Sequence, residues 1–294
     1  MKVFLAGGTG FVGGHLRKAL LAEGHTIRLL AHRRGDGFGP EIEQVDGDAA
    51  DPSDWRERVR GCDAVINLIG IIREYPGRGI TFEKLHVQAT QTLVDAAKAA
   101  GVGRYLQMSA LGSRRNAVSH YHQTKYRAEE YVRSSGLQYT IFRPSLIFGP
   151  GDAFVNMIAD QIRTLPAIPV IGDGSYQLQP IHVVDVARCF TMALANPETA
   201  GKTYELCGTD SLSYDQMVDT IGWVLGKSKV TTVHNPLPLM KLVVPLMQKL
   251  PFFPLTMDQL TMLVEGSVCD SEWRSTFDFA PIRFEDGIHE YLKK

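Results

Sequence analysis

The chain opens with a short apolar segment that runs directly into a cluster of glycines. Residues 2–6 (KVFLA) are apolar enough for a buried parallel strand, and GGTGFVGG follows at residues 7–14. The next segment, HLRKALLAEG, has the spacing of a helix that ends at Gly24, and TIRLLA predicts a second strand. This order predicts a strand–helix–strand unit, and therefore an α/β fold with a parallel sheet.

The spacing of the glycines predicts a phosphate-binding turn. Gly7, Gly10 and Gly13 are spaced GxxGxxG, and Gly8, Gly10 and Gly13 also satisfy GxGxxG. Glycines permit a tight turn and close approach of a pyrophosphate, while the following helix offers N–H groups and a partial positive charge. Between a first strand and a first helix, the pattern favours a dinucleotide site over a simple connecting turn. We expect the cofactor to contact Gly7, Thr9, Gly10, Phe11, Val12 and Gly13.

The end of the second strand bears on which dinucleotide binds. An acid there would bind the adenosine ribose, but the chain has Ala31, His32, Arg33 and Arg34. Two guanidinium groups can clamp a 2′-phosphate with forked hydrogen bonds, so the sequence favours NADP over NAD. The alternative is that one or both arginines are merely solvated.

Polar residues follow the next two expected strands. Asp48, after a third short strand, is a candidate contact for the adenine amino group, and the alternative is a polar turn. The segment CDAVINLIG predicts a fourth strand. Asn67 and Gly70 would then lie beside the cofactor ribose, at the carboxyl edge of the sheet where ligands bind.

A tyrosine and a lysine four residues apart follow the fifth expected strand, YLQM. Tyr121 and Lys125 would lie one turn apart on one face of a helix. Such a pair can transfer protons beside a bound cofactor, and it can also be ordinary helix surface.

These motifs resemble, in their order along the chain, the short-chain dehydrogenase/reductase superfamily in its extended and atypical branches. The matching pieces are GGTGFVG, INLIG, YLQMSALG, YHQTK, FRPSLIFGPGD and PIHVVDVA, which cover the chain to about residue 190. The closest resemblance is to the atypical subgroup that includes the NADPH-binding accessory subunit of respiratory complex I and bacterial nucleoside-diphosphate-sugar epimerase-like proteins. INLIG, the SALG strand end, the helix beginning YHQTK and the later PLT-x-DQL stretch carry that match.

The resemblance implies catalytic roles for three residues. Tyr121 would be the general acid/base, and Lys125 would lower the pKa of Tyr121 while it holds the nicotinamide ribose. Ser109 would orient the substrate oxygen, although Ala110 stands at the position that often carries this hydroxyl in extended members. His86 aligns with the asparagine of the family, and from the residues alone it is a core or helix-surface histidine.

Further site residues come from the second half of the matched region. The resemblance places Pro144 beside the nicotinamide, whereas a proline there could simply end the strand. His182 and Asp185 match the HVxDVA of the family, and we interpret them as a structural histidine and a helix cap.

The resemblance also implies the fold: a doubly wound parallel sheet of the Rossmann type with a smaller C-terminal substrate lid. The dinucleotide-binding domain would comprise residues 1–150 and 176–202, and the lid residues 151–175 and 203–294. The apolar segment 236–266 predicts lid core, with an apolar ligand pocket or a membrane or partner contact as alternatives.

Composition excludes several classes of protein. A formal net charge of −1 gives no basic footprint for nucleic acid. The cysteines (Cys62, Cys189, Cys207 and Cys269) show no metal-binding spacing, so no metal is expected, and they predict reduced thiols in a cytoplasmic protein. A strand from residue 2 leaves no room for a signal peptide, and no apolar run is long enough for a spanning helix.

Two functions fit these observations. The first is an NADP-dependent oxidoreductase that transfers hydride at a hydroxyl or carbonyl carbon of a small molecule, with an epimerase or dehydratase as a variant. The second is a non-catalytic NADPH-binding accessory or assembly protein of a quinone-linked respiratory complex, with peripheral contact to that complex or a membrane. The helices around Thr90 and Tyr121 often make a dimer face in the family, so a homodimer is a further expectation.

Overall fold

The chain forms two compact units. The computed structural model describes residues 1–32, 38–248, 250, 253, 255–270 and 272–293. The first unit comprises Met1–Arg143, Val186–Glu205 and Glu272–Asp278. The second comprises Pro144–Asp185, Leu206–Ser271 and Phe279–Lys294.

The units interleave along the chain, and their bounds differ from the predicted domains. The segment Glu272–Asp278 belongs to the first unit rather than to the lid. The reason is aromatic packing: the ring of Phe277 lies 5.8 Å from that of Phe142 and 5.0 Å from that of Tyr204. A segment as short as Glu272–Asp278 has no periodic pattern of apolar residues, so the sequence did not indicate that it packs in the first unit.

A seven-stranded sheet forms the first unit, in the order β11-β6-β5-β4-β1-β2-β3. Its strands are β1 (Lys2–Ala6), β2 (Thr26–Ala31), β3 (Ile42–Asp46), β4 (Ala64–Asn67), β5 (Arg104–Met108), β6 (Gln138–Pro144) and β11 (Lys202–Leu206). Every ladder from β6 to β3 is parallel. The winding reverses between β3 and β4, so the neighbours β1 and β4 make the switch point where ligands bind in such sheets.

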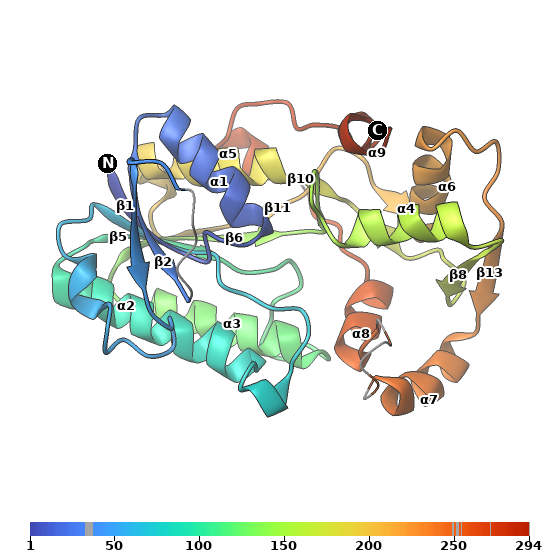
Figure 1. Ribbon diagram of the computed structural model, residues 1–294, viewed down its shortest axis with the longest axis horizontal. Helices are drawn as coiled ribbons and strands as arrows, with labels where there is room; N and C mark the ends of the chain where they lie inside the picture. The colour runs from blue at the N-terminus through green and yellow to red at the C-terminus, as the bar shows by residue number, and fades with distance from the viewer. Residues whose placement is uncertain (33–37, 249, 251–252, 254, 271, 294) are drawn as a thin grey trace. The chain divides into compact units, whose positions relative to one another are not determined.

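Helices cover both faces of this sheet (Figure 1). Helices α1 (Phe11–Ala22) and α5 (Val183–Ala195) lie on one face, and α2 (Ala89–Ala100) and α3 (His120–Arg133) on the other. Short helices add η1 (Arg56–Val59), η2 (Pro76–Arg78), η4 (Pro197–Thr199) and η5 (Glu272–Ser275). The expected doubly wound α/β architecture is therefore confirmed.

One turn of π-helix, η3 (Glu83–Gln88), runs directly into α2. The sequence predicts one regular helix here. The wider turn carries His86 into the interior, where it is 1% exposed, and such turns are frequent at functional sites.

The second unit packs helices around a separate apolar core. Helices α4 (Phe154–Thr164), α6 (Tyr214–Val224) and α9 (Phe284–Leu292) supply most of this core. Small two-stranded sheets pair β7 (Ile147–Phe148) with β10 (Ile181–His182), β8 (Ile168–Ile171) with β13 (Thr232–Asn235), and β9 (Gln177–Leu178) with β12 (Leu212–Ser213).

The apolar segment 236–266 forms helices α7 (Leu237–Met247) and α8 (Met257–Glu265). We predicted lid core here, and for α7 this is wrong: among its residues only Val244 is buried. Apolar composition alone does not distinguish a buried helix from an exposed one. No helix in the described part of the chain is long and apolar enough to span a membrane.

The prediction of four reduced thiols is also wrong. Cys207, directly after β11, forms a disulfide with Cys269 across a Cα–Cα distance of 6.1 Å. Both residues belong to the second unit, and 62 positions separate them in the sequence. Their spacing carried no pairing signal, because several helices and strands of the second unit lie between them and only the fold brings them together. Cys62 and Cys189 are buried thiols.

Candidate active site

The turn between β1 and α1 needs glycine at two positions. Gly7 has φ +79°, and a Cβ there would lie 2.9 Å from the backbone nitrogen of Ile69. A Cβ on Gly13 would lie 2.4 Å from the carbonyl oxygen of Gly7 and 2.5 Å from Cα of Gly8. Since these contacts are with backbone atoms, no side chain can be accommodated by local adjustment. The turn is therefore as tight as the glycine spacing predicted.

The N-terminus of α1 remains open above this turn. Its N-cap is Gly10, and within the described residues no side chain caps the helix and its first turn has no acid. Thr9 and Gly10 are exposed, Phe11 is half-buried and Val12 is buried. A Cβ on Gly10 would meet only the Gly7 oxygen, at 3.5 Å. The helix therefore offers N–H groups that suit a pyrophosphate, and the residues present fit the expected dinucleotide.

Asn67, the last residue of β4, is fully buried. Its Nδ2 donates to Thr90 Oγ1 and Gln107 Oε1, each at 3.1 Å, and its Oδ1 accepts a 2.9 Å bond from Ile69 N. These bonds use the donors of the side chain and hold the loop that follows β4. In the structure Asn67 shapes the edge where ligands bind, and its direct contact with a cofactor stays a prediction.

Lys125 is buried under this edge of the sheet. Its ammonium donates to the carbonyl oxygens of Ile69 at 3.1 Å and Met108 at 3.3 Å, which follow β4 and end β5. Gly70 provides the room, since a Cβ there would lie 2.7 Å from Lys125 Nζ. Burial lowers the pKa of Lys125 to about 8, and the charge of Glu129 opposes this change. Lys125 thus links the ends of two neighbouring strands, and its contact with the ribose stays a prediction.

Tyr121 lies one helical turn before Lys125, in an aromatic cage. Its ring meets Phe82 at 5.7 Å, His86 at 5.2 Å and His122 at 5.3 Å between centroids, all edge-on. Within the described residues its hydroxyl has no hydrogen-bond partner. Burial raises the pKa of Tyr121 to about 12, the opposite of the lowering that the sequence predicted from Lys125. Tyr121 therefore keeps its proton at neutral pH.

His86 connects the loop after β4 to α3. Its Nδ1 lies 2.9 Å from Thr124 Oγ1, whose hydroxyl donates to the carbonyls of His120 and Tyr121. Thr124 therefore accepts from Nδ1–H, which leaves Nε2 to accept from Ile71 N at 3.2 Å. Burial, with the charge of Lys125 second, lowers the pKa of His86 to about 2. His86 is a neutral structural histidine, as its interpretation from the residues alone proposed.

Ser109 directly follows β5 and is buried. Its hydroxyl donates to Ser113 Oγ at 3.2 Å, and its backbone nitrogen donates to Phe142 O at 2.7 Å. Ser109 is thus tied to the loop after β5 and still has lone pairs to accept a hydrogen bond. Its role as the oxygen-binding residue stays a prediction.

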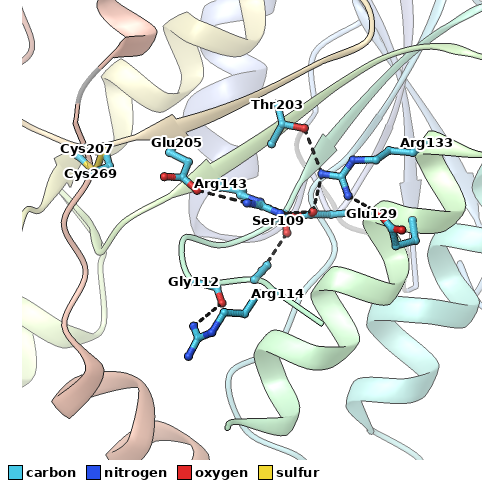
Figure 2. A network of polar contacts seen from close by, with 12 residues as sticks. Ser109, Gly112, Arg114, Glu129, Arg133, Arg143, Thr203, Glu205, Cys207 and Cys269 are labelled. Carbon is cyan, nitrogen blue, oxygen red and sulfur yellow. Dashed lines mark hydrogen bonds and ion pairs between the residues drawn. A yellow bond between two sulfur atoms is a disulfide. The ribbon is translucent and has the colours of Figure 1, made fainter. Parts of the chain in front are cut away.

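A charge cluster surrounds Glu129, one helical turn after Lys125 along α3, and sequence reasoning missed it (Figure 2). Glu129 on α3 is 0% exposed and receives hydrogen bonds from Arg143 and Arg133. Arg143 also pairs with Glu205 at 3.2 Å. A four-residue repeat in α3, from Tyr121 through Lys125 to Glu129, was the available signal, because it places all three on one helix face.

The remaining predicted residues lie in two other places. Asp48 accepts from Ala50 N at 2.9 Å and pairs with Lys84 at 2.8 Å, which is the geometry of the polar turn kept as its alternative. Arg33 and Arg34 lie outside the described residues. Pro144 is the last residue of β6, in the second unit.

The HVxDVA pair has structural roles in the second unit. The ring of His182 packs on Phe148 at 5.0 Å, and Asp185 accepts a 2.8 Å hydrogen bond from Ile282 N. Asp185 therefore fastens a segment that is distant in the sequence, and its role as a helix cap stays a prediction. Among the described residues, no cluster of three or more His, Cys, Asp or Glu side chains could hold a metal.

A glycine turn at the switch point, an open helix N-terminus and a Tyr–Lys pair at the neighbouring strand ends define an NAD(P)-binding protein of the short-chain dehydrogenase/reductase type. The chain belongs to the NAD dependent epimerase/dehydratase family, whose pattern matches residues 3–207. The family and fold expected from the sequence are thereby confirmed. NAD(P) as the cofactor class follows from the family.

Three curated relatives illustrate the range of the family. NADH dehydrogenase (ubiquinone) 1 alpha subcomplex subunit 9 of Mus musculus is 31% identical over 79% of this chain and 63% of its own. Ceramide reductase of Caulobacter vibrioides is 32% identical over 63% of this chain and 58% of its own. The 2-alkyl-3-oxoalkanoate reductase of Stenotrophomonas maltophilia is 27% identical over 78% of this chain and 77% of its own. The chain spans less than two thirds of the length of the first mitochondrial relatives.

Solved structures share the whole fold. MoeE5 in complex with UDP-glucose and NAD superposes with a TM-score of 0.78 at 17% identity, covering 100% of this chain and 98% of that one. At this identity the likeness concerns the fold alone.

Proposed function

We propose that this protein is an NADP-dependent reductase that acts on the carbonyl group of a small molecule. The observation that carries the proposal is the protonated Tyr121 hydroxyl, free of protein partners among the described residues, one turn from the buried ammonium of Lys125. When bound, the nicotinamide supplies the hydride that adds to the carbonyl carbon. Tyr121 gives its proton to the carbonyl oxygen, and the product is the alcohol.

The two pKa values bear on the protonation state in which the pair meets its substrate. A tyrosine whose pKa is about 12 is a poor base and holds the proton that a reduction consumes. Lys125 stabilises the tyrosinate that proton transfer leaves behind, and its own pKa of about 8 makes it a source for reprotonation near neutral pH. At neutral pH the pair therefore holds the proton that the proposed reduction consumes.

We infer that the substrate carries an apolar chain rather than a nucleoside diphosphate. Ceramide and a 2-alkyl-3-oxoalkanoate, named for two of the relatives, both carry alkyl chains. The segment 236–266 of this chain is rich in Leu, Met, Phe and Pro. A nucleoside diphosphate is held by basic side chains, and Lys227 and Lys229 are the only nearby basic pair in this region.

The preference for NADP rests on Arg33 and Arg34, which follow β2 where an acid would select NAD. A cytoplasmic location and a homodimer through α2 and α3 are further parts of the proposal. Cell fractionation and analytical ultracentrifugation test them directly.

The deciding experiment follows NADPH absorbance with pooled carbonyl compounds that bear alkyl chains. Wild type should oxidise NADPH, whereas Tyr121→Phe should bind NADPH normally and turn over at least about 100-fold more slowly. Tyr126→Phe is the matched control, since Tyr126 lies on the same helix and on a different face, and it should behave as wild type. Equal turnover by wild type and Tyr121→Phe would show that Tyr121 is not the acid.

A second candidate function is a non-catalytic NADPH-binding subunit near a respiratory complex. The 31% identity to the mouse complex subunit favours it, as does the replacement of the family asparagine by His86. In that case Lys125 would bind the cofactor and neither wild type nor Tyr121→Phe would turn over. Comigration of the protein with a respiratory complex on native gels, lost after removal of NADPH, would support this function.

A further inference from the structure

Arg17 on helix α1 is a half-buried arginine whose charge has no protein anion beside it in the described part of the chain. Its Nε is buried and makes no hydrogen bond to any described residue. Burial also lowers the pKa of Arg17 below its usual range. A guanidinium that is partly removed from water costs free energy unless an anion compensates it, so Arg17 is a candidate for binding an anionic ligand.

The side chain of Arg17 lies over the beginning of its own helix. Its Nη2 lies 4.0 Å from the position that a Cβ on Gly14 would occupy. Gly14 follows the N-cap residue Gly10 by about one turn, and helical side chains lean toward the N-terminus of their helix. The cation is therefore within about one turn of the open N–H groups that suit the pyrophosphate of the dinucleotide.

Phe38 contacts the guanidinium of Arg17 from the connection between β2 and β3. The Cζ of Arg17 lies over the ring of Phe38, 4.6 Å from its centroid, which is a cation–π contact. A guanidinium that stacks on a ring by its face keeps the N–H groups of its edge available for forked hydrogen bonds. In sheets of this type the 2′ position of the adenosine ribose lies at the end of the second strand. Arg17 thus joins the two elements that would bind the adenosine half of the cofactor.

We propose that Arg17 binds the 2′-phosphate of NADPH and contributes to a preference for NADPH over NADH. This inference rests on the NADP part of the proposed function, and it does not depend on turnover. The contacts of Arg17 with Gly14 and Phe38 carry it, so it is separate from the prediction for Arg33 and Arg34. The pyrophosphate is the other anionic group of the cofactor, and the N–H groups of α1 are available for it.

The test is isothermal titration calorimetry of the purified protein with NADPH and with NADH, since both carry the pyrophosphate and only NADPH carries the 2′-phosphate. Arg17→Met keeps an apolar stem beside Phe38 and removes the charge. It should weaken NADPH binding about tenfold and change NADH binding by less than about twofold. Arg17→Lys keeps the charge without the fork, so its affinity for NADPH should lie between those of wild type and Arg17→Met. Higher salt should reduce the difference between wild type and Arg17→Met.

The matched control is Lys18→Met, which removes a positive charge from the next position of the same helix. Lys18 is exposed, and successive helical residues point in different directions. Lys18→Met should therefore keep both affinities within about twofold of wild type, because solvent and salt screen a charge on the outer face. Thermal melts without cofactor should give Arg17→Met the same melting temperature as wild type, which will show that its fold is intact.

The possible outcomes separate this inference from the proposed function. Discrimination between NADPH and NADH that survives unchanged in Arg17→Met would overturn the inference and leave the NADP assignment standing. Equal weakening of NADPH and NADH would assign Arg17 to the pyrophosphate or to packing, and an equal loss in Lys18→Met would reveal a general effect of charge; either result overturns the inference. Equal affinity of wild type for both dinucleotides would overturn the inference together with the NADP assignment. Failure of the reductase function would appear only in the NADPH absorbance assay.

Discussion

Arg143 holds both carboxylate oxygens of Glu129, with Nε 2.8 Å from Oε1 and Nη2 2.7 Å from Oε2 (Figure 2). Glu129 has no exposed surface, so the charges of Arg143 and Arg133 compensate its own. Burial lowers the pKa of Lys125, one helical turn away, and the same carboxylate opposes this lowering. The charge cluster therefore has two effects. It binds α3 to β6, and its carboxylate favours the protonated form of Lys125.

Replacement of Glu129 by Gln should change both the stability of the fold and the pKa of Lys125. It leaves the half-buried Arg143 and Arg133 with only their outer partners Glu205 and Glu130, and removal of one member of a buried pair costs about 3 kcal/mol of unfolding free energy. It should also lower the pKa of Lys125 further. Urea denaturation measures the first effect, and the alkaline limb of the pH profile for NADPH binding measures the second. Glu130→Gln is the control, because Glu130 pairs with the same Arg133 at the surface and should change stability by less than about 1 kcal/mol.

Lys125 should leave a signature in the pH dependence of stability. Its pKa is about 8 in the folded protein and near 10.5 when unfolded, so between these values the unfolded chain binds the extra proton. Stability from this group therefore rises with pH across that window. The unfolding free energy of wild type minus that of Lys125→Met should increase from pH 8 to pH 10.5. A flat difference would mean that Lys125 titrates normally.

Gly13 and Gly14 offer a matched pair of substitutions in α1. Gly13→Ala would place a Cβ 2.4 Å from the Gly7 oxygen, so it should destabilise the fold by about 2 kcal/mol or more and abolish NADPH binding. Gly14→Ala meets only the end of the Arg17 side chain, at 4.0 Å, and should stabilise the helix by about 0.5 kcal/mol. Thermal melts and fluorescence titration with NADPH compare the two. Similar behaviour of both variants would contradict the tight turn.

The arginines after β2 should set cofactor preference. Arg33→Ala/Arg34→Ala should weaken NADPH binding at least about tenfold and leave NADH binding nearly unchanged, because only NADPH carries the 2′-phosphate. Arg60→Ala, a surface arginine paired with Glu57, is the control. Isothermal titration calorimetry measures the affinities of wild type and both variants for NADPH and for NADH. Equal loss for the two would remove the basis for NADP.

The sequence predicts local elements well and distant contacts poorly. The bounds of β1 and β2 agree with the segments KVFLA and TIRLLA, because a buried parallel strand is a continuous apolar run. The glycine turn could also be predicted from the sequence, because its glycine spacing is required where the backbone passes too close to itself for a side chain. The YHQTK motif identified Lys125. The lowered pKa of Lys125 could not be predicted, because it depends on burial and on the position of Glu129, which only the fold determines.

Other features had no local signal at all. The π-turn that buries His86, the pairing of Cys207 with Cys269 and the exposure of helix α7 all depend on which segments meet in three dimensions. The tautomer of His86 follows from Thr124, 38 residues away. The composition of segment 236–266 shows that it is apolar, but it could not show which of its residues are buried and which are exposed.

The interleaving of the two units has a consequence for biosynthesis. Trp273 and Phe277, which complete the packing around Phe142, are synthesised after almost all of the second unit. A growing chain therefore carries an unfinished first unit until the segment Glu272–Asp278 has left the ribosome. Neither unit can be cut out as one continuous piece, so truncations meant to isolate the nucleotide-binding half should retain or graft the segment Glu272–Asp278.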